Sequence, residues 1–383
     1  MTMSSPPTQA PTRPPKNTVL VTGAGGYIGF AVSRAFARAG WDVYGLIRRA
    51  GGAADALLAE EITPIVGAIS ADLGFLDDFF LAQPPSSTRA FDVVVSCTEQ
   101  IPFDEHWGHV NALLTKVAHH AKQNGGGKKP LVLMSSGCKD YGQTRRHGEP
   151  GLAAHTETSP LEPVEVLAAR TACTLQVFEQ PNRDLYDAAV VRPTPLFEYG
   201  GSYYGVLFEA LGRFRDQGGA EEGGGGEAVR VPGHDDNIYH GCHVDDCADA
   251  YVALATHPSR AQVSGECFNV SGYRYETVGE VLSALAAEYG IRGGIATAPL
   301  AEVAAVRPEL RALEAVLGYT QWVDSTKIRK LTGWTDRRRL FSENTRAYRL
   351  AYEAAARAGD AGVARIRDRV AGWAEAGLSF ERK

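Results

Sequence analysis

The chain has 383 residues, of which 44% are hydrophobic and 22% are charged, and this composition indicates a soluble protein with two or three folded units. Its 45 acidic and 39 basic side chains give a net charge of -6 without a basic block, which argues against nucleic acid as a partner. No stretch reaches the length of about 18 apolar residues that a membrane span needs, so we expect no membrane partner.

The N-terminal residues and the cysteines indicate the cellular setting. Residues 1–16 are rich in Pro, Ser, Thr and Gln and lack an apolar centre, which predicts a disordered tail rather than a secretion signal. The six cysteines include no C-x-x-C pair, so the sequence indicates neither a zinc site nor a disulfide framework. A reducing compartment fits this pattern best, and we expect a cytoplasmic protein.

The first folded segment carries a glycine pattern that is typical of nucleotide binding. An apolar strand at 19–21 runs into Gly23, Gly26 and Gly29, and a helical pattern follows. We expect Gly23 to allow a tight turn, Gly26 to let the backbone approach a diphosphate, and Gly29 to let the helix pack on the strand. The start of a helix offers unpaired N–H groups and a positive dipole end, so phosphate would bind there.

Strand-like apolar runs alternate with helical stretches along the first half of the chain. The predicted strands are 19–21, 43–47, 63–66, 91–96, 131–134 and 188–191. This alternation predicts an α/β fold with a Rossmann-type, doubly wound parallel sheet. The Val-rich runs at 92–96 and 131–134 fit strands that are buried on both faces.

The second half of the chain is different in composition. A glycine-rich segment at 218–226 indicates a flexible insertion. Helical patterns follow it, at 277–289, 300–317, 325–332 and 342–358. We expect these helices to form a smaller C-terminal cap over the carboxyl ends of the strands, where ligands of open α/β sheets bind.

Several motifs, in this order and spacing, resemble the extended short-chain dehydrogenase/reductase family, which includes nucleotide-sugar epimerases and dehydratases. The motifs are TGAGGYIG at 22–29, Val110-Asn111, Ser135-Ser136, Tyr141-Gly142, Arg192-Pro193, His243-Val-Asp-Asp246, Phe268-Asn-Val-Ser271 and the segment 327–334. The resemblance covers about residues 17–355. It implies a dinucleotide-binding domain at 17–200, to which 230–272 return, and a substrate-binding portion made of 201–229 and 273–383.

The choice of cofactor can be argued from the end of the second strand. An acidic residue there would bind the ribose 2′-hydroxyl of NAD, whereas arginine would pair with the 2′-phosphate of NADP. Arg48 and Arg49 stand at this place, so NADP(H) is favoured over NAD(H). The alternative is that both arginines are only solvated surface residues.

The resemblance implies further cofactor contacts along the strand ends. These residues are Tyr27, Ile28, Ile69, Cys97, Thr98, Lys139 and Pro193. One departure concerns the adenine end, where the family usually has an Asp after a glycine. Here Gly67 is followed by Ala68 and Ile69, so only the backbone could contact the base.

The catalytic motif departs further from the family. Relatives use a Tyr as acid/base with a Lys four residues later, but Val166 and Arg170 stand at these positions. Valine cannot transfer a proton, and arginine supplies charge without readily acting as a base. The carbonyl-polarising hydroxyl could come from Ser135 or Ser136, although an ungapped comparison puts the family's serine at Gly137.

A second resemblance offers a partial substitute for the missing pair. The segment 136–142 is similar to the T-G-x-K-H-Y motif of the atypical reductases that include progesterone 5β-reductase and iridoid synthase. On this resemblance Lys139 would lie beside the nicotinamide ribose, while the tyrosine of those reductases has no counterpart here. Tyr141 is a candidate for the proton, and its alternative is a structural role in the loop. Asp140 and Cys138 fit a loop carboxylate and a buried thiol better.

Few residues in the sequence can be assigned to the substrate pocket. We expect Tyr203, Tyr204 and Arg170 to face the pocket, with a role in the core or in a lid as the alternative for the tyrosines. No basic cluster indicates a nucleotide diphosphate sugar, so a less charged small molecule is favoured. Helices after the fourth and fifth strands have apolar residues that would permit a homodimer.

Histidine and two aspartates in His243-Val-Asp-Asp246 form a common metal-ligand set. The family resemblance argues against a metal, because this segment is structural in relatives, with Asp245 expected to fix the start of a helix. We therefore expect no metal site.

Three functions are compatible with these observations. The first is an NADPH-dependent reductase of a small carbonyl or enone, with Lys139 anchoring the ribose and Tyr141 or Ser136 stabilising the oxyanion. The second is a non-redox isomerase, epimerase, dehydratase or cyclase on the same scaffold, which the loss of the tyrosine at Val166 favours. The third is a catalytically silent sensor of NADP(H).

Overall fold

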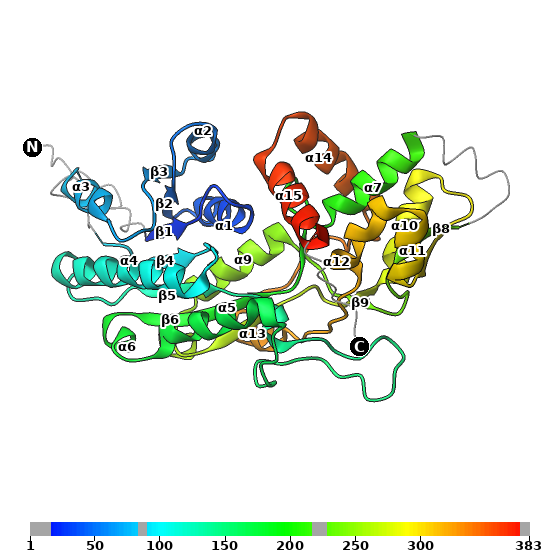
Figure 1. Cartoon of the computed structure of the whole chain (residues 1–383). Coiled ribbons are helices and arrows are strands. Elements are labelled where there is room, and N and C mark those ends of the chain that lie inside the picture. Colours follow the sequence, from blue (N-terminus) through cyan, green and yellow to red (C-terminus); the bar gives the residue numbers. More distant parts are fainter. Residues whose placement is uncertain (1–16, 83–89, 217–227, 376–383) are drawn as a thin grey trace, which may run out of the picture.

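The computed structural model describes residues 17–82, 90–216 and 228–375. The predicted tail at 1–16 and the predicted insertion at 218–226 lie outside the described residues. Figure 1 shows two lobes, a sheet covered by helices and a second lobe that is mainly helical and comes from later parts of the chain.

The central sheet of the described residues has seven strands, and every neighbouring pair is parallel. The strands are β1 (Thr18–Thr22), β2 (Asp42–Ile47), β3 (Thr63–Val66), β4 (Val93–Ser96), β5 (Leu131–Ser135), β6 (Asp187–Pro193) and β11 (Cys267–Val270). Their order is β11-β6-β5-β4-β1-β2-β3, so the strand order reverses on either side of β1. The predicted doubly wound α/β sheet and its six predicted strands are confirmed. Ligands of such sheets bind at this switch point, beyond the carboxyl ends of the strands.

Helices cover both faces of the sheet. They are α1 (Tyr27–Arg38), α2 (Gly52–Ala59), α3 (Gly74–Ala82), α4 (Phe103–Asn124), α5 (Glu165–Leu175), α6 (Asn182–Leu185) and α9 (Val244–Ala255). Side chains alternate along each strand, so Val19 and Val21 join the core with α1 and α9, whereas Leu20 joins the core with α3 and α4. Strands buried on both faces explain why the runs are continuously apolar.

The C-terminal lobe has a separate core. Its elements are α7 (Gly205–Asp216), β8 (Val229–Pro232), α10 (Val278–Tyr289), β13 (Ile295–Ala298), α11 (Leu300–Val306), η4 (Pro308–Leu313), α12 (Glu314–Leu317), α14 (Thr345–Arg357) and α15 (Ala361–Glu375). Short pairs of β7 (Leu196–Phe197) with β10 (Cys242–His243) and of β9 (Ile238–Tyr239) with β12 (Glu276–Thr277) connect the lobes. No helix in the described ranges combines the length and the apolarity that crossing a bilayer requires.

The C-terminal helices differ in three respects from the sequence expectation. The helix expected at 300–317 is interrupted where Pro308 starts η4, because proline cannot continue the hydrogen-bond pattern. Helix α13 (Thr326–Thr332) packs through Ile328 on the core of the sheet lobe instead of the cap. Helix α15 was not expected, and in Figure 1 it lies between the two lobes.

Candidate functional site

The glycine pattern forms a tight loop between β1 and α1. Gly23 has φ +69°, and a Cβ there would lie 2.8 Å from the carbonyl oxygen of Cys97. A Cβ on Gly29 would lie only 2.1 Å from the carbonyl oxygen of Gly23, so the helix contacts the loop without room for any side chain. The structural roles expected for Gly23 and Gly29 are confirmed. At Gly26 a Cβ would lie 3.0 Å from the carbonyl oxygen of Gly23, so a side chain there would crowd the loop.

The start of α1 is suited to an anion. Gly26 is the N-cap residue, and no side chain caps the first turn. The first turn also contains no acidic residue that would repel a phosphate. The helix therefore presents N–H groups and its positive dipole end at the carboxyl edge of β1.

The two side chains at the start of α1, Tyr27 and Ile28, hold the glycine loop in place through a hydrogen bond and core packing. The Tyr27 hydroxyl donates to the carbonyl oxygen of Glu198 at 3.0 Å, which ties α1 to the segment after β7. Ile28 packs against the core beneath the sheet. These positions place both predicted contacts beside the loop, with their side chains engaged in packing.

The end of β2 lies next to the glycine loop. A Cβ on Gly25 would be 3.4 Å from the Ile47 side chain, so the residues after Ile47 leave the strand close to the loop. Arg48 and Arg49 are both exposed. An arginine in this position can reach a phosphate on a ribose that lies between the loop and β2.

The other predicted cofactor contacts lie at the carboxyl ends of β3, β4 and β6. Gly67 lies beneath the Phe75 ring, which a Cβ would approach within 2.3 Å, and Ile69 packs against the core on that face. Pro193 is buried at the end of β6. The Cys97 thiol lies 3.3 Å from the Ser135 hydroxyl, and burial raises the pKa of this thiol to about 12, so it stays protonated. Thr98 Oγ1 lies 3.0 Å from His106 Nε2.

A buried carboxylate, Asp140, organises the end of β5. It is 1% exposed and accepts hydrogen bonds from four side chains. The donors are Ser136 Oγ at 2.6 Å, Arg170 Nη2 at 2.6 Å, Thr171 Oγ1 at 2.8 Å and Arg192 Nε at 3.1 Å. Asp140 is therefore the centre of a buried ion-pair cluster rather than a loop carboxylate on the surface.

Tyr141 belongs to the same cluster. Its hydroxyl donates to Asn269 Oδ1 at 2.8 Å and accepts from Arg192 Nη1 at 2.9 Å. Burial raises the pKa of Tyr141 above its usual range, although Arg192 opposes the shift. The side chain is 1% exposed. This environment favours a structural role and argues against the predicted role as proton donor.

Val166 and Arg170 lie one helical turn apart on α5. Val166 is 47% exposed. The Arg170 guanidinium is half-buried and lies against Gly137, where an added Cβ would be 3.5 Å from Nη2. A fixed positive charge therefore stands at the carboxyl end of β5, held there by Asp140.

Lys139 points toward the C-terminal lobe. Its Nζ lies 4.5 Å from the centre of the Tyr319 ring, a cation–π contact. Burial and the neighbouring Arg170 lower the pKa of Lys139 from 10.5 to about 8, and the Glu314 carboxylate opposes this shift. Lys139 also lines a cavity of about 20 Å³.

Tyr203 and Tyr204 have different environments. Tyr203 is half-buried; its hydroxyl accepts from Arg369 Nη1 at 3.0 Å, and its ring stacks on Trp373 with centroids 5.3 Å apart. Tyr204 is 1% exposed and stacks on Tyr239 with centroids 4.5 Å apart, inside the C-terminal core. This position favours a packing role for Tyr204 and argues against the predicted substrate contact.

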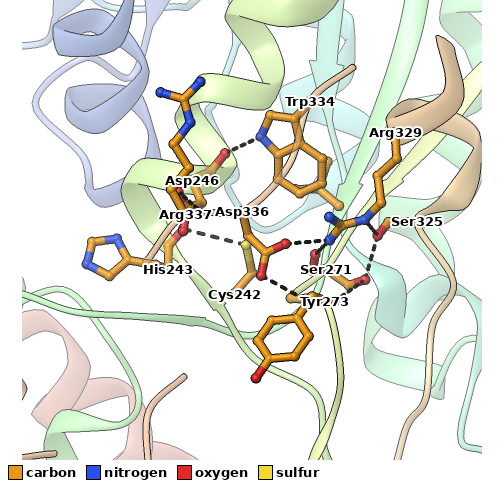
Figure 2. Close-up of polar contacts among 12 residues, drawn as sticks. Cys242, His243, Asp246, Ser271, Tyr273, Ser325, Arg329, Trp334, Asp336 and Arg337 are labelled. Carbon is orange, nitrogen blue, oxygen red and sulfur yellow. Dashed lines mark hydrogen bonds and ion pairs between the residues drawn. The ribbon is translucent and has the colours of Figure 1, made fainter. Parts of the chain in front are cut away.

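The segment His243–Asp246 ties the lobes together. His243 is the N-cap of α9 and accepts a hydrogen bond from the Asp245 N–H, so the capping residue is His243 and not the expected Asp245. Asp245 forms an ion pair with Arg34 of α1 instead. Figure 2 shows the polar network on the other side, where the Trp334 indole N–H donates to the backbone oxygen of Asp246.

The same network continues to the end of β11. Arg329 pairs with Asp336 at 2.8 Å and donates to the Ser325 hydroxyl, which lies 2.9 Å from Ser271 (Figure 2). These groups link α13 to the end of β11. Among the described residues, no group of three or more His, Cys, Asp or Glu side chains could hold a metal ion.

Sequence reasoning missed three residues near the site. They are Glu314 and Tyr319 beside Lys139, and Arg369 beside Tyr203. All three come from the C-terminal 70 residues and reach the site only through the packing of the two lobes. No motif or spacing in the sequence marks them.

Comparisons with known proteins agree with this geometry. The model of the NAD dependent epimerase/dehydratase family matches residues 19–271. A comparison with curated protein sequences finds no match.

Solved structures share the fold at low sequence identity. One is a UDP-glucuronic acid 4-epimerase from Bacillus cereus, in complex with UDP-glucuronic acid and NAD, at 15% identity over 88% of this chain and 99% of that chain, with a TM-score of 0.60. A UDP-glucose-4-epimerase from Stenotrophomonas maltophila with bound NAD has 19% identity over 89% and 99%, with a TM-score of 0.61. The terminal R domain of the myxalamid PKS-NRPS pathway has 16% identity over 90% and 91%, with a TM-score of 0.60.

Proposed function

The chain belongs to the NAD dependent epimerase/dehydratase family, and we propose that it is an NADP(H)-dependent oxidoreductase that reduces a small organic carbonyl or enone. The observation that carries the proposal is the set of cationic side chains along the carboxyl edge of the sheet. Arg48 and Arg49 are exposed at the end of β2, and Arg170 and Lys139 lie around the end of β5. The first pair suits the 2′-phosphate, and the second pair suits an oxygen that becomes negative.

The residues present fit a dinucleotide. Side chains at Gly23 or Gly29 would collide with the backbone that shapes the loop, and the start of α1 has no side-chain cap, so its first N–H groups can face a diphosphate. Arg48 and Arg49 would hold the phosphate on the adenosine ribose. When bound, the nicotinamide ring supplies the hydride.

The protein's own groups bind and polarise the substrate. Arg170 cannot move freely, because Asp140 holds its guanidinium at 2.6 Å, so its charge is pre-organised. Val166 and Ile101, which are 47% and 76% exposed, offer apolar surface near the starts of α5 and α4. An uncharged organic carbonyl fits this combination of fixed cations and apolar surface.

The hydroxyl groups proposed from the sequence are already engaged. Ser136 donates its proton to Asp140, and Tyr141 donates to Asn269. Ser135 Oγ lies 2.8 Å from the Tyr251 hydroxyl. Each can still accept a hydrogen bond, but none directs a proton at a substrate. A different donor is therefore required for carbonyl reduction.

A non-redox isomerase or epimerase on the same scaffold is the second candidate. The observation that favours it is Val166, an exposed aliphatic residue where the family pattern has its acid/base tyrosine. Such an enzyme would change its substrate without net consumption of NADPH.

The experiment compares cofactor binding and turnover. Purified protein is mixed with NADPH and a panel of enones, ketones and aldehydes, and the nicotinamide absorbance is followed together with product formation. Loss of NADPH with a reduced product supports the proposal, and a rearranged product without NADPH loss supports the isomerase. Binding without any product change contradicts both.

A charge reversal tests the cofactor assignment. Arg48→Asp should weaken NADPH binding by about ten- to a hundredfold, because it removes a charge-assisted hydrogen bond, and should leave NADH binding unchanged or improved. Arg230→Asp makes the same change of charge at a 69% exposed site in the C-terminal lobe and serves as the control. Equal NADPH affinity of wild type and Arg48→Asp, with Arg49→Asp also neutral, refutes the assignment.

A further inference from the structure

The loop after β5 is clamped to a segment of the C-terminal lobe. Gln321 Nε2 donates to the carbonyl oxygens of Cys138 at 2.7 Å and Gly142 at 2.6 Å. The Thr320 N–H donates to Gln143 Oε1 at 3.1 Å, and the Thr144 N–H donates to the carbonyl oxygen of Thr320 at 3.0 Å. These four bonds flank η1 (Cys138–Tyr141), so residues 319–321 are held in one position relative to Lys139.

Tyr319 is the side chain that this clamp brings to Lys139. It is 4% exposed, and its ring lies beneath the Lys139 ammonium at 4.5 Å. Val164, just before α5, and Trp373 of α15 pack with it, so two segments distant in sequence fix the ring. A ring held in this way keeps its hydroxyl in one place, which is a condition for efficient proton transfer.

The charges around Tyr319 suit a proton donor rather than a base. Burial raises the pKa of Tyr319 above its usual value, and the Arg170 guanidinium opposes this shift. The phenol therefore stays protonated at neutral pH, while a fixed cation stands ready to stabilise the phenolate. The pKa of Lys139, lowered to about 8, lets its ammonium give up a proton near neutral pH.

Lys139 and Tyr319 line the same small cavity. Its other walls include Tyr239, His240 and Gln321. Its volume of about 20 Å³ exceeds the ~10–15 Å³ that one water needs. The space therefore matches a single polar atom, such as a carbonyl oxygen or a water that relays a proton.

We propose that Tyr319 is the proton donor of the reaction and that Lys139 restores its proton, so that a tyrosine from the C-terminal lobe replaces the one that α5 lacks. The inference rests on the proposed function. As the carbonyl oxygen becomes negative, it takes the phenol proton of Tyr319. The phenolate then takes a proton from the Lys139 ammonium, and the neutral amine regains one from solvent.

The assignment of Tyr319 as proton donor also limits the direction of the reaction and the position of the substrate. A phenol that stays protonated favours reduction over alcohol oxidation, which requires a base. Because both lobes contribute to the pair, the substrate oxygen must lie where they meet.

The decisive variant is Tyr319→Phe, which keeps the ring and its contacts and removes only the hydroxyl. Tyr289→Phe is the matched control, because Tyr289 is a buried tyrosine of the C-terminal core that is 5% exposed and is not among the residues that line the cavity. Circular dichroism and NADPH titration check that both variants fold and bind cofactor as the wild type does. With a carbonyl substrate from the panel, Tyr319→Phe should lower kcat by about a hundredfold or more with little change in KM. The control should stay within about threefold.

A second readout needs no turnover. Binding of para-nitrophenolate, an oxyanion whose visible absorbance reports its ionisation, is measured with and without NADP+. The Tyr319 hydroxyl should stabilise this anion, so Tyr319→Phe should weaken its binding by about tenfold or more. Equal binding by wild type and Tyr319→Phe, or no binding by wild type, overturns the inference. Failure of NADPH and NADP+ to bind refutes the proposed function separately.

The pH dependence of kcat tests the role of Lys139. Lys139 faces Arg170 from α5, Glu314 from α12 and Tyr319, and it shares its cavity with Tyr239 of β9 and the following His240. With the ammonium as proton supply, kcat of the wild type should fall above about pH 8. Lys139→Met should be slower and should lack this decrease. The same high-pH decrease in both proteins removes Lys139 from the proton path.

Discussion

The buried cluster around Asp140 provides a quantitative test of how the site is held. Asp140→Asn keeps the shape of the side chain and removes its charge. Asp140 and Arg192 are 1% and 2% exposed, so the guanidinium left behind cannot regain its hydration. Removing one partner of such a buried pair costs about 3–5 kcal/mol. This is a large part of the ~5–15 kcal/mol by which a native protein is stable.

An exposed ion pair is the control. Lys116 and Asp77 are 2.6 Å apart, as are Arg170 and Asp140, but the side chains of Lys116 and Asp77 are 30% and 61% exposed. Asp77→Asn should therefore lower the free energy of unfolding by about 1 kcal/mol or less. Urea unfolding followed by tryptophan fluorescence measures both variants at one pH and salt concentration. Equal free energies of unfolding for the two variants would refute the argument that burial makes Asp140 essential.

Two further predictions follow from particular residues. Gly29→Ala should abolish NADPH binding and destabilise the protein, because the new Cβ would lie 2.1 Å from the Gly23 carbonyl oxygen. Gly212→Ala, inside α7 with open space around its Cβ, should leave NADPH binding unchanged and stabilise the protein by up to about 1 kcal/mol. Wild-type stability should rise relative to Lys139→Met between about pH 8 and 10.5, because the folded state there binds fewer protons than the unfolded state. A constant difference in Tm across that range contradicts the second prediction, and normal NADPH binding by Gly29→Ala contradicts the first.

The sheet could be predicted from the sequence because its signals are local. A strand buried on both faces must be continuously apolar, and the runs that became β4 and β5 showed this pattern without reference to any partner. The turn at Gly23 and the contact at Gly29 were likewise predictable, since only glycine fits a backbone contact of that kind. These features depend on residues that are close together in the chain.

Helix α15 and the break at Pro308 show where the local signals were missed or misread. Val363, Ile366 and Val370 have helical spacing and are buried, but arginines and glycines surround them and reduce the apolar signal. Pro308 breaks the helix that was expected at 300–317. The apolar spacing on both sides of Pro308 is helical, and this pattern led to the prediction of one continuous helix.

The site was less predictable because its chemistry depends on packing between the lobes. The sequence indicates Lys139 and Arg170 as cations, but the aromatic ring beside Lys139 belongs to Tyr319, far along the chain. Tyr141 carried a plausible motif, and its bonds to Asn269 and Arg192 appear only when β6 is placed beside β5 and β11 beside β6. Residues joined by tertiary contacts carry no spacing that a sequence pattern can detect.

Calorimetric titration of the wild-type protein with NADPH, and separately with NADH, tests the central claim most directly. The account predicts saturable binding of NADPH that is tighter than that of NADH, because the loop at Gly23 to Gly29 receives the diphosphate and Arg48 and Arg49 receive the 2′-phosphate. Absence of binding by both cofactors would contradict it.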